Sequence, residues 1–504
     1  MNFIFFSPIS FEKWDWRNSV EKGIGGSETS HVEMAWRLAR RGHTVTTYAP
    51  IPDDCPGEWR GTRWYPLEDV NWDLDGVWIL YRCPEKVDMF KDHDKKRKKV
   101  WLLWQDWDYP TLTKERNKDI DHHITLCKAH GNYILNKYKF VKRKQLWLTS
   151  NGVKADLIEE IEKEEDSDIK RYAFDWGGTI ENHEELRQYA RDVYAAGHEV
   201  YLVPALASGT NFPYEQKLKE LNVPYHAIYR VFSLAPHDSS DVANRKRMVL
   251  EGIGADYFWD DLEHNVKWAR SAGIKSFLVE KDKPAEIPSE PITKVGRNPF
   301  RIMHASSPDR GLKQAVSIFK KAKEYVPELE LHAFYGFDNL DKMIKGRPNS
   351  PIAKNVKELK RLLKTTPGIT FHGRVSQPEL YREWFKSGMY LYITEFAETS
   401  NIASQEAQAM GAVPVFSPIW AQGENIKYGI GVEGLSNDPL TIARAASEIV
   451  RLALTPGLQE KIREEMMPWA RDRFNWERFT TQWILEAQGK RKEFEEKCDF
   501  PEQL

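Results

Sequence analysis

Short apolar runs alternate with helical patterns along most of the chain, and this alternation constrains the fold more than any other feature. An apolar run at 2–6 precedes a glycine turn at 23–26, a helical pattern that Ser27 can cap, and a further apolar run at 44–48. The same order returns near the other end of the chain, with apolar runs at 300–305, 329–335, 369–372, 389–393 and 413–416. Strands that alternate with helices form mostly parallel sheets, so the sequence predicts an α/β protein.

Two changes in composition divide the chain. Residues 154–171 are charged and poor in aromatic side chains, and an apolar run at 172–174 follows at once, so we interpret them as a linker rather than a solvated helix. Residues 281–298 contain three prolines and several charges, which indicates a second linker. The predicted domains are 1–153, 165–285 and 296–470, with a charged helical tail at 471–504.

The overall composition is that of an ordinary globular protein. The 504 residues include 73 Lys and Arg and 75 Asp and Glu, and 41% of the residues are hydrophobic. The near balance of charge argues against a strongly basic nucleic-acid binder. The four cysteines are scattered without a C-x-x-C pair, which favours a reducing compartment and predicts a cytoplasmic location. No run is long and apolar enough to cross a membrane.

The stretch 394–411, TEFAETSNIASQEAQAMG, follows an apolar run and opens a helix. Backbone N–H groups around Ser400, Asn401 and Ile402 would point at whatever lies above the helix N-terminus, and such a site favours a phosphate or diphosphate. A carboxylate there, from Glu398 or Glu406, can accept hydrogen bonds from sugar or ribose hydroxyls. Two glutamates eight positions apart, taken alone, are more typical of a solvated helix face.

In its context this stretch resembles the E-x7-E signature of retaining GT-B glycosyltransferases, the group related to glycogen synthases and bacterial mannosyltransferases. The resemblance implies that Glu398 lies near the donor sugar and Glu406 near the nucleotide ribose. Residues 304–336 look like the first βαβ unit of the donor domain of that family. In that unit Arg310 matches the basic residue that contacts the donor diphosphate.

The resemblance covers about 1–153 and 298–485. GIGGSE at 23–28 looks like the turn in which Gly25 and Gly26 let the backbone approach donor phosphate or acceptor. Asn151-Gly152-Val153 resembles the element that closes the first domain of the family. The final helix resembles the tail that crosses back to that domain.

The middle block has a separate resemblance, to haloacid-dehalogenase-like (HAD) phosphatases. YAFDWGGTI at 172–180 looks like their first motif, with Asp175 in the place of the nucleophile, and Asp260 begins an acidic pair similar to their metal-binding motif. The resemblance implies a Mg²⁺ site at Asp175 and Asp260. Gly177 replaces the general acid, which predicts weak or absent phosphatase activity. Lys246 either neutralises the phosphorylated aspartate or lies on the surface.

The sequence therefore predicts two Rossmann-like domains of a GT-B glycosyltransferase and an inserted α/β HAD-like domain. The expected donor is a UDP- or GDP-sugar, transfer is expected to retain configuration, and Mg²⁺ is expected only in the HAD-like domain. The acceptor class stays open among lipid, polysaccharide, protein, small molecule and nucleic acid, as does the oligomeric state.

Other functions remain as alternatives. One is a HAD-type phosphatase or phosphate-binding protein whose flanking domains recognise substrate, and Gly177 argues against it. Another is a metal-dependent GT-A transferase, for which D-x-D triplets lie at 73–75 and 106–108, but two separate βαβ halves fit that fold poorly. The last is a binding protein without activity, against which Glu398, Glu406 and Arg310 argue.

Overall fold

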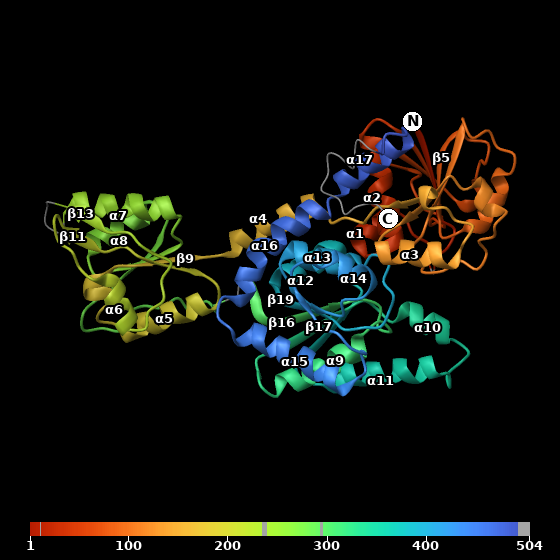
Figure 1. Cartoon of the computed structure of the whole chain (residues 1–504). Helices are drawn as coiled ribbons and strands as arrows, with labels where there is room; N and C mark the ends of the chain where they lie inside the picture. Colours follow the sequence, from red (N-terminus) through yellow and green to blue (C-terminus); the bar gives the residue numbers. More distant parts are fainter. Residues whose placement is uncertain (11, 234–238, 293–295, 492–504) are drawn as a thin grey trace. The chain divides into compact units, whose positions relative to one another are not determined.

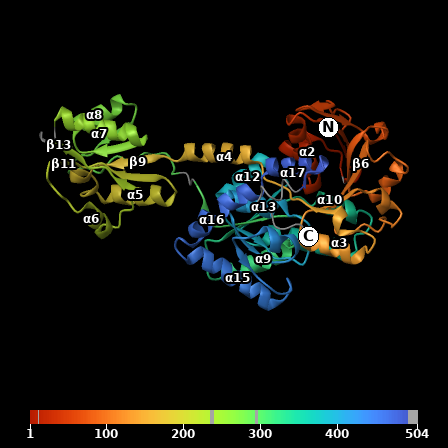
Figure 2. The same ribbon diagram turned by 45° about the horizontal axis from the view of Figure 1, so that its top comes forward.

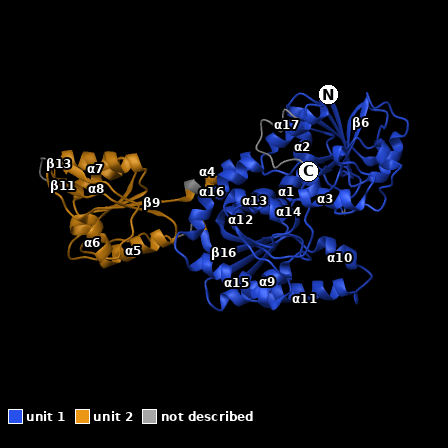
Figure 3. Ribbon diagram, viewed as in Figure 1, with its two compact units in different colours: residues 1–161, 298–504 blue, residues 162–297 orange. Residues whose placement is uncertain are grey.

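The computed structural model describes residues 1–10, 12–233, 239–292 and 296–491, and the chain forms two compact units. Unit 1 combines Met1–Ile161 with Asn298–Leu504, and unit 2 is Glu162–Arg297 (Figure 3). Unit 2 encloses the predicted 165–285 block. Within unit 1 we call residues 1–153 the N-terminal lobe and residues 298–473 the C-terminal lobe.

The N-terminal lobe is built on a sheet to which β5 belongs (Figure 1). Its strand order is β3-β4-β2-β1-β5-β6-β7-β8, parallel except for the β3–β4 pair. Phe3 and Phe5 of β1 enter one hydrophobic core, whereas Ile4 and Phe6 enter another, so both faces of the sheet are covered. This explains why β1 is a continuous apolar run. The strands are β1 Asn2–Phe6, β2 Thr44–Tyr48, β3 Glu58–Trp59, β4 Thr62–Tyr65, β5 Gly76–Tyr81, β6 Lys98–Leu103, β7 His122–Thr125 and β8 Leu146–Leu148. The helices are α1 Trp16–Glu21, α2 Gly26–Arg40 and α3 Lys128–Lys137, with short 3-10 turns at Leu67–Asp69, Pro84–Phe90, Arg116–Asp119 and Arg143–Gln145.

The C-terminal lobe has a parallel sheet of order β18-β17-β16-β19-β20-β21, which is the order 3-2-1-4-5-6 of a dinucleotide-binding fold. Its strands are β16 Asn298–Ala305, β17 Glu330–Phe334, β18 Ile369–Gly373, β19 Ser387–Tyr392, β20 Val413–Phe416 and β21 Ile430–Gly431. Its helices are α9 Leu312–Lys323, α10 Asp338–Ile344, α11 Pro351–Thr365, α12 Gln377–Lys386, α13 Ile402–Met410, α14 Trp420–Asn425, α15 Pro439–Leu454 and α16 Leu458–Arg473.

After α16 the chain returns to the N-terminal lobe. Helix α17, Trp476–Ala487, lies beside α2 of the N-terminal lobe (Figure 2). Its side chains Trp476, Phe479 and Trp483 enter the same core as Phe5 and Trp101. The Glu477 carboxylate accepts hydrogen bonds from the last turn of α2 and its C-cap residue, and its partners are Arg37 and Arg41 at 3.0 Å each and Arg40. Residues 492–504 of the predicted tail lie outside the described residues.

Unit 2 has its own parallel sheet of order β12-β10-β9-β14-β15 and a small β11–β13 pair. The strands are β9 Arg171–Phe174, β10 Glu199–Leu202, β11 Ala205–Ala207, β12 Ala227–Ile228, β13 Val231–Ser233, β14 Tyr257–Asp260 and β15 Lys275–Leu278. The helices are α5 Glu184–Ala195, α6 Tyr214–Glu220, α7 Ser240–Ile253 and α8 Glu263–Ser271, and a π-type turn covers Trp176–Ile180.

The stretch 154–171 leads into a new unit as predicted, because the boundary between the two units falls between Ile161 and Glu162. It is nevertheless helical, since Ala155–Asp168 forms helix α4. Ile158 and Ile161 are buried in a core of unit 1, at the i, i+3 spacing of one helix face, while acidic residues occupy the positions around them. The predicted second linker has no helix or strand over its described part before β16 begins at Asn298, and its residues 293–295 are outside the described ranges. Among the described residues, no helix has the length and apolar character needed to span a membrane.

Candidate functional site

The C-terminal lobe sheet reverses its winding direction between β16 and β19. Arg310 lies on the turn that follows β16, and Glu398 lies on the loop that follows β19. Ligands of open parallel sheets bind at this place, outside the carboxyl ends of the strands on either side of the switch point. The fold therefore brings together two predicted site residues that are 88 positions apart.

Glu398 is held by a tyrosine and an arginine. The Tyr392 hydroxyl donates a hydrogen bond of 2.6 Å to Glu398 Oε1, and Arg310 Nη1 lies 3.4 Å from the same oxygen. Tyr392 is fully buried, and burial together with the Glu398 charge raises the pKa of its hydroxyl well above the ordinary value. Tyr392 therefore remains a proton donor that fixes the orientation of the carboxylate.

The Arg310 guanidinium lies on the ring of Phe396, 3.9 Å from its centroid. Its Nε is buried and has no hydrogen-bond partner within the described part of the chain. Burial lowers and Glu398 raises the pKa of Arg310, with a net upward shift that keeps the charge. The next residue, Gly311, has φ +101, and an added Cβ would lie 2.7 Å from the carbonyl oxygen of Ile393. This turn of the chain needs glycine to bring Arg310 to Glu398.

The N-terminus of α13 lies next to these residues. Asn401 adopts φ +58 and caps the helix by accepting from Ser404 N at 3.2 Å, and Ile402 is the first helical residue. Ser400 Oγ accepts a hydrogen bond of 3.0 Å from Asn151 Nδ2 of the N-terminal lobe. The first N–H groups of a helix have no acceptor within the helix, so this end of α13 favours an anion.

The predicted glycine turn faces α13 from the N-terminal lobe. An added Cβ on Gly26 would lie 3.4 Å from Ile402 Cδ1, so the N-termini of α2 and α13 meet. Gly25 serves a different purpose, because an added Cβ there would collide with the carboxylate of Glu28. Glu28 in turn pairs with Arg82 at 3.1 Å. The chain thus places one of its own carboxylates beside the N-terminus of α2.

Glu406 does not share a hydrogen-bond partner with Glu398 or Arg310. It is buried, and it accepts hydrogen bonds of 3.4 Å from Gln377 Nε2 and from Trp384 Nε1, both on α12. Burial raises its pKa to about 7. The spacing of eight positions turns its carboxylate toward α12 rather than toward Glu398.

Buried amide groups without partners surround the place where the lobes meet. Gln105 Nε2, Asn151 Oδ1, Gln405 Oε1 and both polar atoms of the Gln422 side chain have no hydrogen-bond partner among the residues that the structure describes. The Gln105 carbonyl accepts from Thr399 Oγ1 at 3.1 Å, which places this residue beside Glu398. Buried amides need partners, and a ligand rich in hydroxyl groups would supply them.

Sequence reasoning missed Tyr392 and Phe396. Both lie within six residues of Glu398, one at the end of β19 and one in the loop after it. The aromatic residues of that stretch were a usable signal, because an aromatic next to a charged residue can hydrogen-bond to it or stack on it.

Unit 2 has a second cluster at its own switch point, between β9 and β14. Asp175 follows β9 and Asp260 ends β14, and Lys246 Nζ donates hydrogen bonds of 2.6 Å to each of them. Lys246 is therefore buried between two carboxylates and does not lie on the surface. Burial, opposed by the charge of Lys246, raises the pKa of Asp175 above its ordinary value.

Oxygen atoms of Asp175, Asp260 and Asp261 lie within 4.8 Å of one another. Carboxylates are the ligands that Mg²⁺ prefers, so the donor set fits that ion. Asp260 is also fixed in place, because its Oδ1 accepts from Leu262 N and Asn265 Nδ2 at 2.9 Å each. Lys246 already balances part of the negative charge of the cluster.

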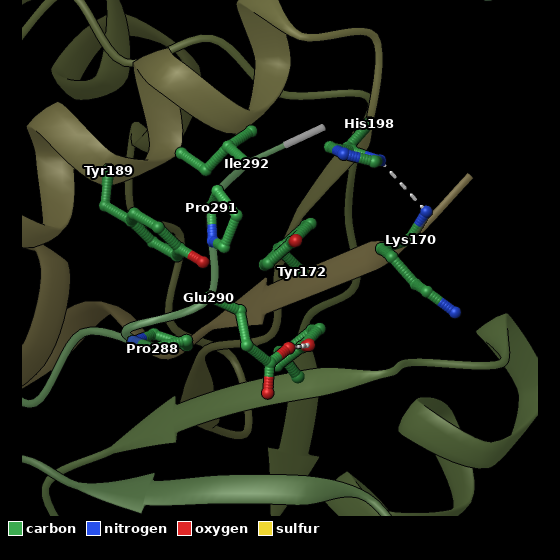
Figure 4. A pocket seen from close by; sticks show the side chains of 9 residues that line it. Lys170, Tyr172, Tyr189, His198, Pro288, Glu290, Pro291 and Ile292 are labelled. Carbon is green, nitrogen blue, oxygen red and sulfur yellow. Dashed lines mark hydrogen bonds between the residues drawn. The ribbon is translucent and has the colours of Figure 1, made fainter. Parts of the chain in front are cut away.

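A pocket of about 300 Å³ opens elsewhere in unit 2, and neither Asp175 nor Asp260 lines it (Figure 4). The rings of Tyr172 and Tyr257 stack there with centroids 4.8 Å apart. The lining residues are Lys170, Tyr172, Tyr189, His198, Tyr257, Pro288, Glu290, Pro291 and Ile292.

No protein-family model and no curated protein sequence matches the chain, whereas solved structures do. A glycosyltransferase from Rickettsia africae superposes with a TM-score of 0.54 at 13% identity, over 99% of both chains. HepE of Anabaena, solved with UDP-glucose, has a TM-score of 0.52 at 10% identity, over 97% of this chain and 100% of its own. Sucrose-phosphate synthase from Thermosynechococcus elongatus has a TM-score of 0.51 at 12% identity, over 97% and 98%. The chain thus has the GT-B fold of these glycosyltransferases.

Proposed function

We propose that this protein is a glycosyltransferase that moves a sugar from a UDP- or GDP-sugar to an acceptor, with retention of configuration. The observation that carries the proposal is the meeting of Arg310, Glu398 and the N-terminus of α13 at the switch point of the C-terminal lobe. The likeness to glycosyltransferases that include HepE, solved with UDP-glucose, supports the same conclusion. The scattered cysteines support a cytoplasmic location.

The parts of the site have separate roles in this proposal. The Arg310 guanidinium and the N–H groups of Ser400, Asn401 and Ile402 stabilise the negative charge that grows on the departing diphosphate. Glu398 and the amide groups of Gln105 and Gln422 hold hydroxyls of the sugar. Catalysis then rests on positioning and charge stabilisation, with no metal needed for transfer.

The roles of the remaining predicted residues follow the same proposal. Gly26 lets α2 approach the donor phosphate or the acceptor from the N-terminal lobe, beside Gly25. Glu406 of α13 accepts hydrogen bonds from Gln377 and Trp384 of α12, so in the ligand-free protein it holds the two helices together, and in this proposal it also accepts from the ribose when the donor binds.

The first test is thermal unfolding of the protein with a panel of UDP-, GDP-, ADP- and TDP-sugars. A donor at about 100 times its Kd adds roughly 2.7 kcal/mol to the free energy of unfolding, which raises the Tm measurably. We expect one nucleotide class to raise the Tm, and Glu398→Ala and Arg310→Ala to abolish the effect. If every donor leaves the Tm of the wild-type protein unchanged, in the presence of candidate acceptor sugars as well, the proposal fails.

A second activity in unit 2 is favoured by the cluster of Asp175, Lys246 and Asp260. We propose a HAD-like domain that binds a phosphate-bearing molecule, with Mg²⁺ held by Asp175, Asp260 and Asp261 and with weak or absent phosphatase activity. Mg²⁺ would supply positive charge for the phosphate oxygens. The test is Mg²⁺-dependent hydrolysis of p-nitrophenyl phosphate, with Asp175→Asn as the control. If the wild type and Asp175→Asn hydrolyse the substrate at the same background rate, phosphatase activity is excluded and binding remains as the role of the domain. If calorimetry then detects no binding of Mg²⁺ or phosphate, the binding role is excluded as well.

A further inference from the structure

Two histidines and a glutamate converge on one face of the C-terminal lobe sheet. His332 lies on β17, His372 on β18 and Glu383 on α12, and each offers one ligand atom within 4.8 Å of the others. His332 Nδ1 and His372 Nε2 are 2.9 Å apart. These residues are not part of the proposed transfer site. The proposed transfer reaction does not require an ion bound to them.

Neighbouring side chains fix the orientation of both imidazole rings. His372 stacks on Phe334, with ring centroids 4.3 Å apart and planes inclined by 8°. His332 Nε2 lies 3.5 Å from a carboxylate oxygen of Glu330. A metal-binding histidine commonly directs its other ring N–H at a carboxylate, which sets the tautomer that leaves the ligand nitrogen unprotonated.

Arg301 on β16 currently supplies the positive charge of the cluster. Its Nη2 donates to His332 Nδ1 at 2.7 Å and to Glu383. The guanidinium is not fully satisfied there, because Arg301 Nε is buried with no hydrogen-bond partner in the described ranges. His332 Nδ1, with a single lone pair, is approached by both Arg301 Nη2 and His372 Nε2.

We propose that His332, His372 and Glu383 form a binding site for a divalent transition metal of the Zn²⁺ class. Arg301 contacts these ligands in the metal-free protein, and the metal displaces it on binding. Two histidines and a carboxylate are a ligand set that Zn²⁺ accepts, with Zn–N distances of about 2.0–2.1 Å. A tetrahedral ion then needs the two nitrogens about 3.3 Å apart, an opening of a few tenths of an ångström. Imidazole ligands favour Zn²⁺, Cu²⁺ or Ni²⁺ over Mg²⁺ and Ca²⁺.

Arg301 has another partner within reach when a metal displaces it. Glu330 is directly opposite Arg301 in the β16–β17 register, and its carboxylate is half exposed. The bound metal would join α12 to strands β17 and β18. Helix α12 also carries Gln377 and Trp384, the partners of Glu406, so the metal would fix the helix that orients this carboxylate.

The test uses the full chain after treatment with a chelator. Calorimetric titration with Zn²⁺ and visible absorption of bound Co²⁺ give the stoichiometry and the coordination. With excess Mg²⁺ present to occupy the carboxylate cluster of unit 2, we expect one Zn²⁺ or Co²⁺ per chain and a four-coordinate Co²⁺ spectrum. His372→Ala and His332→Ala each remove a ligand, so each should lose more affinity than the roughly 10- to 100-fold that loss of an outer-shell partner costs. Arg301→Gln removes the competing cation, so its affinity for Zn²⁺ is expected to rise.

The increase in Arg301→Gln distinguishes a metal site from a general loss of structure, which would weaken binding in every variant. His122→Ala is the matched control, since His122 Nε2 lies 3.0 Å from Glu486 in another part of unit 1, and its affinity should equal that of the wild type. The proposal is overturned if neither the wild type nor Arg301→Gln binds Zn²⁺ or Co²⁺. It is equally overturned if binding persists unchanged in both histidine variants.

Discussion

The hydroxyl of Tyr392 is the residue-scale feature on which the proposed transfer site depends most. Tyr392→Phe removes the 2.6 Å hydrogen bond to Glu398 and leaves the ring in place. Hydrogen bonds to charged groups contribute about 1.5–3 kcal/mol, so we expect kcat to fall roughly 10- to 100-fold with a smaller change in the KM for the donor. Steady-state kinetics with the nucleotide-sugar found by thermal unfolding give both values.

Tyr390→Phe is the matched control for this prediction. Tyr390 is also fully buried and stacks on Tyr392, but its hydroxyl accepts a 3.4 Å hydrogen bond from Asn401 Nδ2 and does not contact Glu398. Equal losses of kcat in the two variants would mean that packing of the aromatic pair matters, and that the orientation of Glu398 does not.

A second residue-scale prediction concerns the pH dependence of stability. Burial raises the pKa of Glu406 from 4.5 to about 7, so the folded protein binds more protons than the unfolded chain between these pH values. Stability therefore falls as the pH rises from about 4.5 to 7. Glu406→Gln should remove this contribution, which amounts to at most about 3 kcal/mol. Urea unfolding at pH 5 and pH 8 measures the difference.

We expect Glu406→Gln to gain stability relative to the wild type between pH 5 and pH 8. An exposed residue, Glu433, serves as the control, since Glu433→Gln should leave the pH profile unchanged. Parallel profiles for the wild type and Glu406→Gln would show that Glu406 is ionised in the folded protein throughout this range.

At the scale of elements, the turn between β16 and α9 depends on Gly311. Gly311→Ala combines a positive φ with a Cβ 2.7 Å from the Ile393 carbonyl oxygen, so the turn must shift and Arg310 with it. We expect a loss of more than about 2 kcal/mol in the free energy of unfolding and a large loss of transferase activity. Gly457→Ala has a similar positive φ of +71 but no atom within 4 Å of the new Cβ, so it measures the backbone cost alone. Similar losses in the two variants would exclude the close approach as the cause.

The tail helix α17 gives a further element-scale prediction. Trp483 is 2% exposed and packs against Trp101 and Trp147 in the N-terminal lobe. Trp483→Ala should lower the free energy of unfolding by about 3–5 kcal/mol, because it leaves a cavity in that core. Trp107→Ala is the contrast, since half of its side chain is exposed and the change should be small. Chemical denaturation of both variants decides whether α17 is part of the core.

Strands and helices were largely predictable, because a parallel strand buried on both faces is a continuous apolar run, as at Asn2–Phe6 and Val413–Phe416. Helix α4 was not, because its acidic residues dominate the composition and its buried face is indicated by just three apolar residues, Leu157, Ile158 and Ile161. Composition averages over a segment, whereas a helix is defined by the spacing of a few residues within it.

For the whole molecule, the resemblance assigns Arg310 and Glu398 to one predicted site and the structure brings them together, but the sequence does not specify the other contacts of the predicted residues. Glu398 and Arg310 meet as expected, but the spacing of Glu398 and Glu406 does not show that Glu406 turns toward α12. Lys246 illustrates the same limit, since its two aspartate partners lie 71 and 14 positions away. Contacts across such distances depend on the strand order of the sheet, which local patterns do not specify.

Unit 2 has its own sheet and its own hydrophobic cores, and this leads to a whole-molecule prediction. Residues 162–297 expressed alone should fold and unfold cooperatively in urea, with a sigmoidal transition followed by circular dichroism. A gradual loss of signal without a cooperative transition would show that the unit needs the rest of the chain.

The return of α17 to the N-terminal lobe also has a consequence for synthesis on the ribosome. Thr149 and Gln482, which share a 2.8 Å hydrogen bond, are 333 positions apart. The core of the N-terminal lobe therefore cannot be completed until nearly the whole chain has been synthesised. At about 5–20 residues per second, this delay is roughly 15–70 s. We therefore expect the faces of Trp101 and Trp147 that α17 covers to be exposed during that time, and the whole of unit 2 to be synthesised before α17.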